Sequence, residues 1–130
     1  YTTLFRSEQA MELLNLVGLG DRAKHLAREL AHGQQRALEI AVALAAKPRV
    51  LLMDEPTAGM SPEETKTMMG LIQKLVQDRT VILVEHKMKM VMGISDHVVV
   101  LHHGQLLAEG TPDQIRNNET VKAVYLGQGH

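Results

Sequence analysis

The stretch Val50-Leu51-Leu52-Met53-Asp54-Glu55 places two adjacent carboxylates directly after four apolar residues. A continuous apolar run that is closed by polar residues is typical of a strand buried on both faces of a parallel sheet. Residues 80–84 repeat the pattern and are followed by Glu85 and His86. Ligands of open α/β sheets bind beyond the carboxyl ends of the strands, so both polar pairs are predicted to lie near a ligand site.

Helical patterns separate and surround these two predicted strands. Ser61-Pro62-Glu63-Glu64 forms a capping box with proline at the first helical position, and the helix is predicted to run to about residue 77. Thr111-Pro112-Asp113-Gln114 repeats this signal. The alternation of strands and helices predicts an α/β domain with a mainly parallel sheet flanked by helices. Further helices are predicted over residues 7–17, 34–46 and 88–93, and strands over residues 98–101 and 105–109 flank a turn at His103-Gly104.

Composition excludes several classes of protein. The 130 residues suit one domain or part of a larger one, and the net charge of -1 gives no reason to expect nucleic acid or an anionic membrane surface as a partner. The absence of cysteine excludes disulfides and thiolate metal sites. No apolar run approaches the roughly 18 residues of a membrane span. The sequence begins with Tyr1 rather than Met, which suggests that an upstream segment is missing.

Three features have the residue types that phosphate chemistry needs. In phosphoryl transfer, the first acid of a pair such as Asp54-Glu55 can hold Mg²⁺ and the second can orient an attacking water. Gly33 leaves the backbone approachable just before a predicted helix, whose amino terminus offers unpaired N–H groups and a positive dipole end. His86 follows a buried strand and can reach a phosphate or water. The alternatives are a solvated loop for the acids and an ordinary polar strand cap for His86.

The order and spacing of these motifs resemble the ATP-binding subunits of ABC transporters. Leu30-Ala31-His32-Gly33-Gln34 is similar to the LSGGQ signature, and residues 50–55 resemble the Walker B strand. Ala58-Gly59-Met60-Ser61 resembles the D-loop, and residues 81–86 resemble the switch strand with its H-loop histidine. The run Glu-Pro-Thr-Ala-Gly-Met and residues 123–127 look most like subunits of branched-chain amino acid importers.

The resemblance implies an ATPase with ATP and Mg²⁺ as its cofactors. Asp54 would hold Mg²⁺ through its water shell, Glu55 would polarise the attacking water, and His86 would contact the γ-phosphate. The signature turn would press on the γ-phosphate of ATP bound to the opposite subunit, and Ser61 would lie across the dimer interface. The residues of that turn are Ala31, His32, Gly33 and Gln34.

The resemblance also implies partners and a location. A second ATPase subunit would complete each ATP site, and membrane permease subunits would couple hydrolysis to import; no nucleic acid partner is expected. The complete subunit would be cytoplasmic and peripheral on the inner face of the cell membrane, held there through the permease.

Three positions depart from the family pattern. Ala31 replaces the signature serine and removes a hydroxyl donor, whose bond to a charged group is typically worth about 1.5–3 kcal/mol. His32 replaces the first signature glycine and carries a ring N–H that can compensate. Ser61 replaces the D-loop aspartate, so the usual contact across the interface would have to form without the aspartate carboxylate.

The largest departure is the phosphate loop, since no G-x-x-x-x-G-K-[ST] motif occurs in these residues. The chain is therefore predicted to be the carboxy-terminal portion of one ABC ATPase domain, with a partial P-loop NTPase core. About residues 1–47 would form part of the helical subdomain with the signature helix, and about residues 48–130 would run from Walker B to the carboxy terminus. Alone, the chain is predicted to be inactive and to self-associate through unpaired strand edges.

Two other functions remain open at this point. The first is an ABC-type ATPase of a soluble machine for DNA repair or translation, although residues 21–34 contain no coiled-coil or long basic insertion. The second is a catalytically dead interaction module, which Ala31 and the missing phosphate loop favour and which Asp54, Glu55 and His86 oppose.

Overall fold

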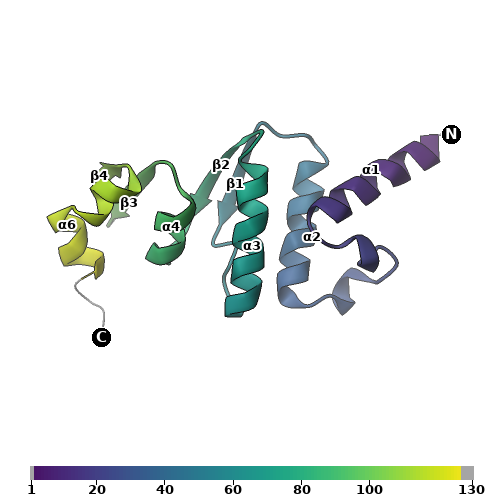
Figure 1. Cartoon of the computed structure of the whole chain (residues 1–130), viewed down its shortest axis with the longest axis horizontal. Coiled ribbons are helices and arrows are strands. Elements are labelled where there is room, and N and C mark those ends of the chain that lie inside the picture. Colours follow the sequence, from purple (N-terminus) through teal and green to yellow (C-terminus); the bar gives the residue numbers. More distant parts are fainter. Residues whose placement is uncertain (1, 127–130) are drawn as a thin grey trace. The chain divides into compact units, whose positions relative to one another are not determined.

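The computed structural model describes residues 2–126, and the chain divides into two compact units, Tyr1–Val84 and Glu85–His130 (Figure 1). The first unit contains the helices α1 (Thr2–Leu16), α2 (His32–Leu44) and α3 (Pro62–Leu75) and the strands β1 (Val50–Asp54) and β2 (Thr80–Val84). The second contains α4 (Met88–Ile94), β3 (Val98–His102), β4 (Gln105–Gly110), α5 (Pro112–Arg116) and α6 (Glu119–Val121). Two short 3₁₀ turns, Gly20–Arg22 and Ala27–Glu29, connect α1 to α2, and a π-helical turn, Lys122–Leu126, follows α6.

The strands of the first unit form a parallel pair, as the sequence predicts. Val50 pairs with Thr80 and Asp54 with Val84, so the carboxyl ends of β1 and β2 meet at the same edge. The helix α3 provides the crossover between them, which makes β1-α3-β2 a βαβ unit. The predicted α/β class with a parallel sheet is confirmed.

The prediction that β1 and β2 are buried on both faces is wrong for the described residues. Leu51 and Met53 are buried, and the other buried side chains of this unit come mainly from α2 and α3. A single βαβ unit has one crossover helix, so its two strands keep one face uncovered. The side chains of that uncovered face, which we call the exposed sheet face, are Val50, Leu52, Ile82 and Val84.

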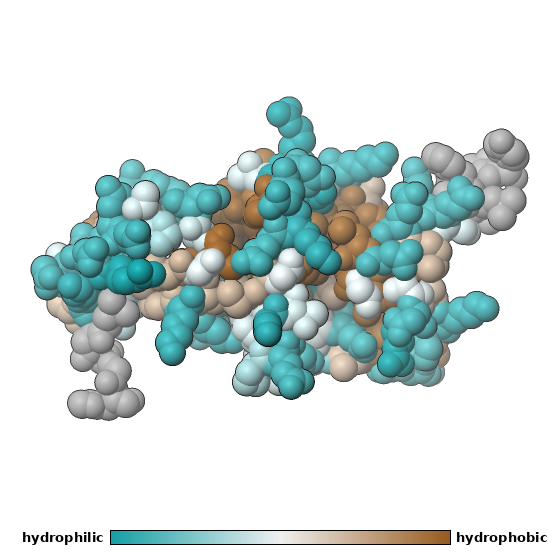
Figure 2. All heavy atoms as spheres, viewed as in Figure 1, coloured by the Kyte–Doolittle hydropathy of each residue, from teal (hydrophilic) through white to brown (hydrophobic). Residues whose placement is uncertain are grey.

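The exposed sheet face is strongly apolar. Leu52 is 72% exposed and Val84 is 58% exposed. Figure 2 has the view of Figure 1, in which α3 lies in front of β1 and β2, and on that side hydrophobic residues (brown) also reach the surface among hydrophilic ones (teal). No helix in the described part of the chain is both long and apolar enough to cross a bilayer.

The start of α3 follows the predicted capping box. The Ser61 hydroxyl accepts a hydrogen bond from the Glu64 N–H at 3.2 Å, and the Glu64 carboxylate accepts one from the Ser61 N–H at 2.9 Å. Pro62 occupies the first helical position, where a missing N–H costs nothing. These bonds fix the first residue of α3 and therefore the loop that leads to it from β1.

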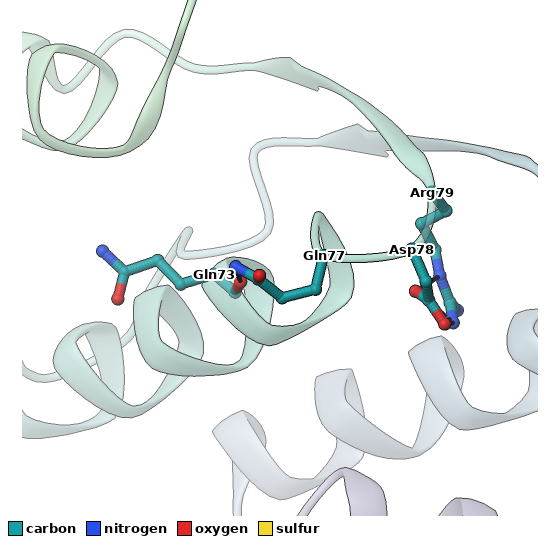
Figure 3. Close-up of polar contacts among 4 residues, drawn as sticks. All are labelled: Gln73, Gln77, Asp78 and Arg79. Atoms are coloured by element: carbon teal, nitrogen blue, oxygen red, sulfur yellow. Dashed lines mark hydrogen bonds and ion pairs between the residues drawn. The ribbon is translucent and has the colours of Figure 1, made fainter.

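Local hydrogen bonds also stabilise the connection from α3 to β2 (Figure 3). Gln77 lies just after α3, and its side-chain amide donates a hydrogen bond to the backbone carbonyl oxygen of Gln73, in the last turn of that helix, at 3.2 Å. The Arg79 guanidinium donates two hydrogen bonds to the Asp78 carboxylate, at 3.0 and 3.1 Å. The Arg79 side chain is only 16% exposed, so this pair helps to hold the start of β2 in place.

The second unit is built on an antiparallel hairpin. β3 and β4 are joined by His103 and Gly104, which have φ values of 48° and 75°. Two residues with positive φ are typical of the tight turns that join antiparallel strands, so the predicted turn is confirmed. Thr111 caps α5 as predicted. The core of this unit consists of Val98, Val100, Ile115 and Val121, with Met88, Val91, Met92, Leu107 and Ala108 packed against it.

Candidate functional site

The acidic pair lies at the carboxyl end of β1. Asp54 is the last residue of the strand and is exposed, on the same face as Leu52. The Glu55 N–H donates to the Val84 carbonyl oxygen at 2.8 Å, which extends the strand ladder by one residue. Glu55 has a φ of 42°, in the left-handed region that non-glycine residues rarely occupy. Such conformations occur preferentially at functional sites, and this one changes the direction of the chain at the second carboxylate.

The segment after Glu55 forms a tight turn. The Ala58 N–H donates to the Glu55 carbonyl oxygen at 3.0 Å, and the Met60 N–H donates to the Thr57 carbonyl oxygen at 3.2 Å. Thr57 is fully buried, so the turn is anchored in the protein interior. Gly59 has a φ of 72°, a conformation that glycine adopts without strain. The turn delivers the chain to Ser61 and α3.

The amino terminus of α2 has no side-chain cap of the usual kind. Ala31 is the N-cap residue, with extended backbone angles, and its side chain has no oxygen. The Gln34 side chain accepts a hydrogen bond from the Ala31 N–H at 3.1 Å. His32 and Gly33 are the first two helical residues, so α2 begins two residues earlier than the sequence predicted.

Two contacts bring the amino termini of α2 and α3 together. A ring nitrogen of His32, Nε2, lies 2.9 Å from the Ala58 carbonyl oxygen, and in the tautomer with a proton on Nε2 it donates to that oxygen. The Gly33 N–H donates to Glu64 Oε1 at 3.2 Å. The structure therefore joins the turn of residues 31–34 to the turn of residues 57–61, and Ser61 is linked to Gly33 through the Glu64 carboxylate, which accepts a hydrogen bond from each.

Hydrogen bonds to Glu64 lower the pKa of its carboxyl group. The largest cause is the bond from the Ser61 N–H, followed by the bond from the Gly33 N–H, and the nearby His32 acts in the same direction. Both bonds favour the ionised carboxylate of Glu64, because its oxygens accept hydrogen bonds and a backbone N–H group can only donate one.

The lowered pKa of Glu64 predicts a pH dependence of stability. In the window between the depressed pKa and the ordinary Glu value of 4.5, the unfolded chain binds more protons than the folded one, so stability rises with pH. The contribution is fully present above that window and is lost as the pH falls through it. Urea unfolding of the parent chain should therefore show a steeper loss of stability in acid than unfolding of Glu64→Gln. Glu63→Gln, which removes the same charge one residue away, should leave the slope unchanged, and a parent-like slope in Glu64→Gln would contradict the prediction.

His86 belongs to the second unit. Its N–H donates to Glu85 Oε2 at 3.1 Å, and its side chain is 68% exposed, whereas the Glu85 side chain is 1% exposed. Its Nδ1 lies 3.9 Å from the same carboxylate oxygen. The buried Glu85 therefore orients the backbone at His86, and the phosphate contact of the imidazole stays a prediction.

The sequence identifies Glu64 only as part of a capping box. Its bond to Ser61 follows from the local pattern, but its second partner, Gly33, is 31 residues away in the sequence. Residue spacing contains no signal for that contact.

The donor set at the end of β1 is compatible with Mg²⁺. No group of three or more His, Cys, Asp or Glu side chains that could hold a metal occurs between residues 2 and 126. Mg²⁺ does not require such a group, because it keeps several waters and is usually bound by one or two carboxylates together with substrate phosphates. The exposed Asp54 carboxylate is suited to that kind of binding.

Two family models match this chain. The ABC transporter model matches residues 5–58, and a model described as branched-chain amino acid ATP-binding cassette transporter matches residues 105–130. The first match contains the signature-like turn and the acidic pair.

Curated relatives of this chain are also named as branched-chain amino acid transport proteins. The chain is 50% identical over 123 residues to BraF of Pseudomonas aeruginosa and 46% identical over 123 residues to LivG of Escherichia coli. Both relatives are named high-affinity branched-chain amino acid transport ATP-binding proteins. Each match covers 93% of this chain and 48% of the relative, so the chain spans about half the length of the curated relatives that it matches.

The fold is shared with solved structures of ATP-binding cassettes. The ADP conformation of MJ1267, an ATP-binding cassette of an ABC transporter, superposes with a TM-score of 0.83 at 29% sequence identity. The match covers 93% of this chain and 50% of that structure.

Proposed function

Because this chain belongs to the family of ABC transporter ATP-binding proteins, we propose that it supplies part of an ATPase subunit that drives import of amino acids. The assignment to branched-chain amino acids is supported by the transport role for which BraF and LivG are named and by the family model that matches residues 105–130. These relatives are transport proteins, so they do not support the alternative of a soluble repair or translation machine.

One structural observation supports the ATPase role above all others. The contact between His32 and the Ala58 carbonyl oxygen joins the signature-like turn to the loop that begins at Glu55 and ends at Ser61, and the bond from Gly33 to Glu64 joins it to α3. In the proposed subunit, the first of these turns would contact the γ-phosphate of ATP on the opposite subunit, and Ser61 would face the same interface. A loop that starts at the hydrolytic carboxylate and ends against the signature turn would link dimer closure to catalysis within one unit.

The two carboxylates would divide the chemistry. Mg²⁺ held through Asp54 would neutralise charge that develops on the phosphates. Glu55 would accept a hydrogen bond from the attacking water and orient it, in a position fixed by its backbone bond to Val84. His86, which follows β2, would contact the γ-phosphate.

The proposed partners are a second ATPase subunit and membrane permease subunits. The complete protein would act at the cytoplasmic face of the membrane, bound to the permease.

Amino acid uptake tests this function directly. We would place the part of BraF that this chain does not match in front of this chain, and we call the product the BraF hybrid. In Escherichia coli cells that lack LivG, the hybrid should restore uptake of radiolabelled leucine. A hybrid that hydrolyses ATP and assembles with the permease but restores no uptake would contradict the importer assignment.

Binding of Mg-ATP to the 130-residue chain itself should be weak. The phosphate loop, which these residues do not contain, normally supplies the lysine and most backbone donors for the β- and γ-phosphates. Asp54 and Glu55 are anions and repel the nucleotide. Isothermal titration calorimetry with Mg-ATP should show no micromolar binding, whereas the BraF hybrid, as the positive control, should bind. Tight binding to the chain alone would show that another segment replaces the phosphate loop.

A further inference from the structure

Glu64 is hydrogen-bonded to the start of two different helices. Oε2 accepts from the Ser61 N–H at 2.9 Å, at the amino terminus of its own helix, α3. Oε1 accepts from the Gly33 N–H at 3.2 Å, at the amino terminus of α2. One carboxylate therefore supplies an anion to both turns of the candidate site.

The bond to Gly33 compensates for the missing cap of α2. Ala31 has no side-chain oxygen, and the first N–H groups of a helix have no partners within the helix. A negative charge at this end is favourable because the helix dipole is positive there. Glu64 thus occupies the kind of position that a phosphate takes at a helix amino terminus.

Gly33 makes this approach possible. A Cβ atom added at Gly33 would lie 2.8 Å from Glu64 Oε1, closer than real Cβ contacts, and 3.2 Å from its carboxyl carbon, which is a tight contact. Glycine at the second helical position of α2 therefore lets the Glu64 carboxylate reach the backbone, whereas a larger residue would require the Glu64 side chain to move. The Gly33 N–H belongs to the turn that the proposed function assigns to the γ-phosphate of ATP on the opposite subunit.

We propose that Glu64 is an internal anion that occupies the phosphate contact at Gly33, so that a phosphate binds there only after the Glu64 carboxylate has withdrawn. This inference rests on the proposed function, which makes residues 31–34 a phosphate-binding turn. A phosphate oxygen at hydrogen-bond distance from the Gly33 N–H would lie next to Glu64 Oε1, and two anions so close repel each other.

Two other bonds let Glu64 withdraw without separating the turns. The Glu64 carboxylate keeps its partner at Ser61, in the same capping box, when it leaves Gly33. The contact between His32 Nε2 and the Ala58 carbonyl oxygen joins the two turns independently of Glu64. A rotation of one side chain is therefore sufficient to open the contact, and the positions of α2 and α3 need not change.

The test is an NMR titration of the 130-residue chain with inorganic pyrophosphate at constant ionic strength, following the amide signals of His32, Gly33 and Gln34. Glu64→Gln should bind pyrophosphate at least about fivefold more tightly than the parent chain, the lower end of the change in affinity that one bound group typically causes for another. Glu64→Ala should change affinity in the same direction, which would assign the effect to the lost carboxylate rather than to the new amide. Glu63→Gln is the matched control, since it removes the same charge from the same turn, and it should bind as the parent does.

The outcomes separate this inference from the proposed function. Equal or weaker binding by Glu64→Gln and Glu64→Ala, with signals of the folded chain retained, would overturn the inference and leave a phosphate-binding turn that Glu64 merely supports. An equal gain in pyrophosphate affinity in Glu63→Gln and Glu64→Gln would show that the loss of any negative charge from this turn causes the effect. That result would also overturn the inference. No response of these amides in any variant would overturn the inference alone, because the proposed function assigns this turn to a phosphate that the opposite subunit holds.

Discussion

Replacing Glu55 with Gln is expected to lower ATP hydrolysis by the BraF hybrid by about 100- to 10,000-fold, the usual contribution of a general base. The amide keeps the shape of the side chain but cannot take a proton from water. Nucleotide binding should survive, because the bond from the Glu55 N–H to the Val84 carbonyl oxygen involves only the backbone. The variant should therefore accumulate as an ATP-bound dimer.

Steady-state phosphate release and sedimentation with ATP measure the two parts of this prediction. Glu63→Gln is a suitable control, because it removes an exposed carboxylate from the first turn of α3, outside the acidic pair. Hydrolysis by Glu55→Gln at the rate of the parent hybrid would show that Glu55 is not the base.

The 130-residue chain is expected to form dimers or larger species at micromolar concentration. The exposed sheet face presents four apolar side chains to solvent, and β1 and β2 pair only with each other among the described residues. Apolar surface next to unpaired strand edges promotes association. Burial of one Leu or Ile side chain is worth about 1.5–3 kcal/mol, and 1.4 kcal/mol corresponds to a tenfold change in affinity. Leu52→Lys and Ile82→Lys should therefore each weaken association by about tenfold or more.

Light scattering after size-exclusion chromatography measures this effect. Val42→Lys is a matched control, because Val42 is 68% exposed on α2 and lies outside the exposed sheet face. A monomeric parent chain would contradict the prediction, and so would an equal effect of Val42→Lys.

The sequence predicts the elements of the first unit well where local signals are strong. The apolar runs give β1 and β2 with bounds that agree within one residue, and the capping box gives the first residue of α3. The helix α1 was predicted over residues 7–17 but begins at Thr2, since the segment before Ser7 has no clear helix-start signal. The start of α2 was missed because its cap comes from Gln34 and from the distant Glu64 rather than from a side chain at Ala31.

Burial and long-range contacts are harder to predict than bounds. Four apolar residues in a row are compatible with a strand covered on one face or on two, so Leu52 was predicted to be buried and is exposed. The candidate site shows the same limit. Residue types and order indicated Asp54, Glu55, Ser61 and residues 31–34, but the bond between Gly33 and Glu64 depends on how α2 and α3 pack. The roles of these residues, and that of His86, stay predictions.

ATP hydrolysis by the BraF hybrid decides whether these 130 residues supply the signature turn and the hydrolytic carboxylate of an ABC ATPase. We expect hydrolysis by the hybrid, and none by this chain alone or by the added part of BraF alone. A hybrid that is folded and binds Mg-ATP but does not hydrolyse it would contradict these roles of the signature turn and of Glu55. It would favour a catalytically dead interaction module instead.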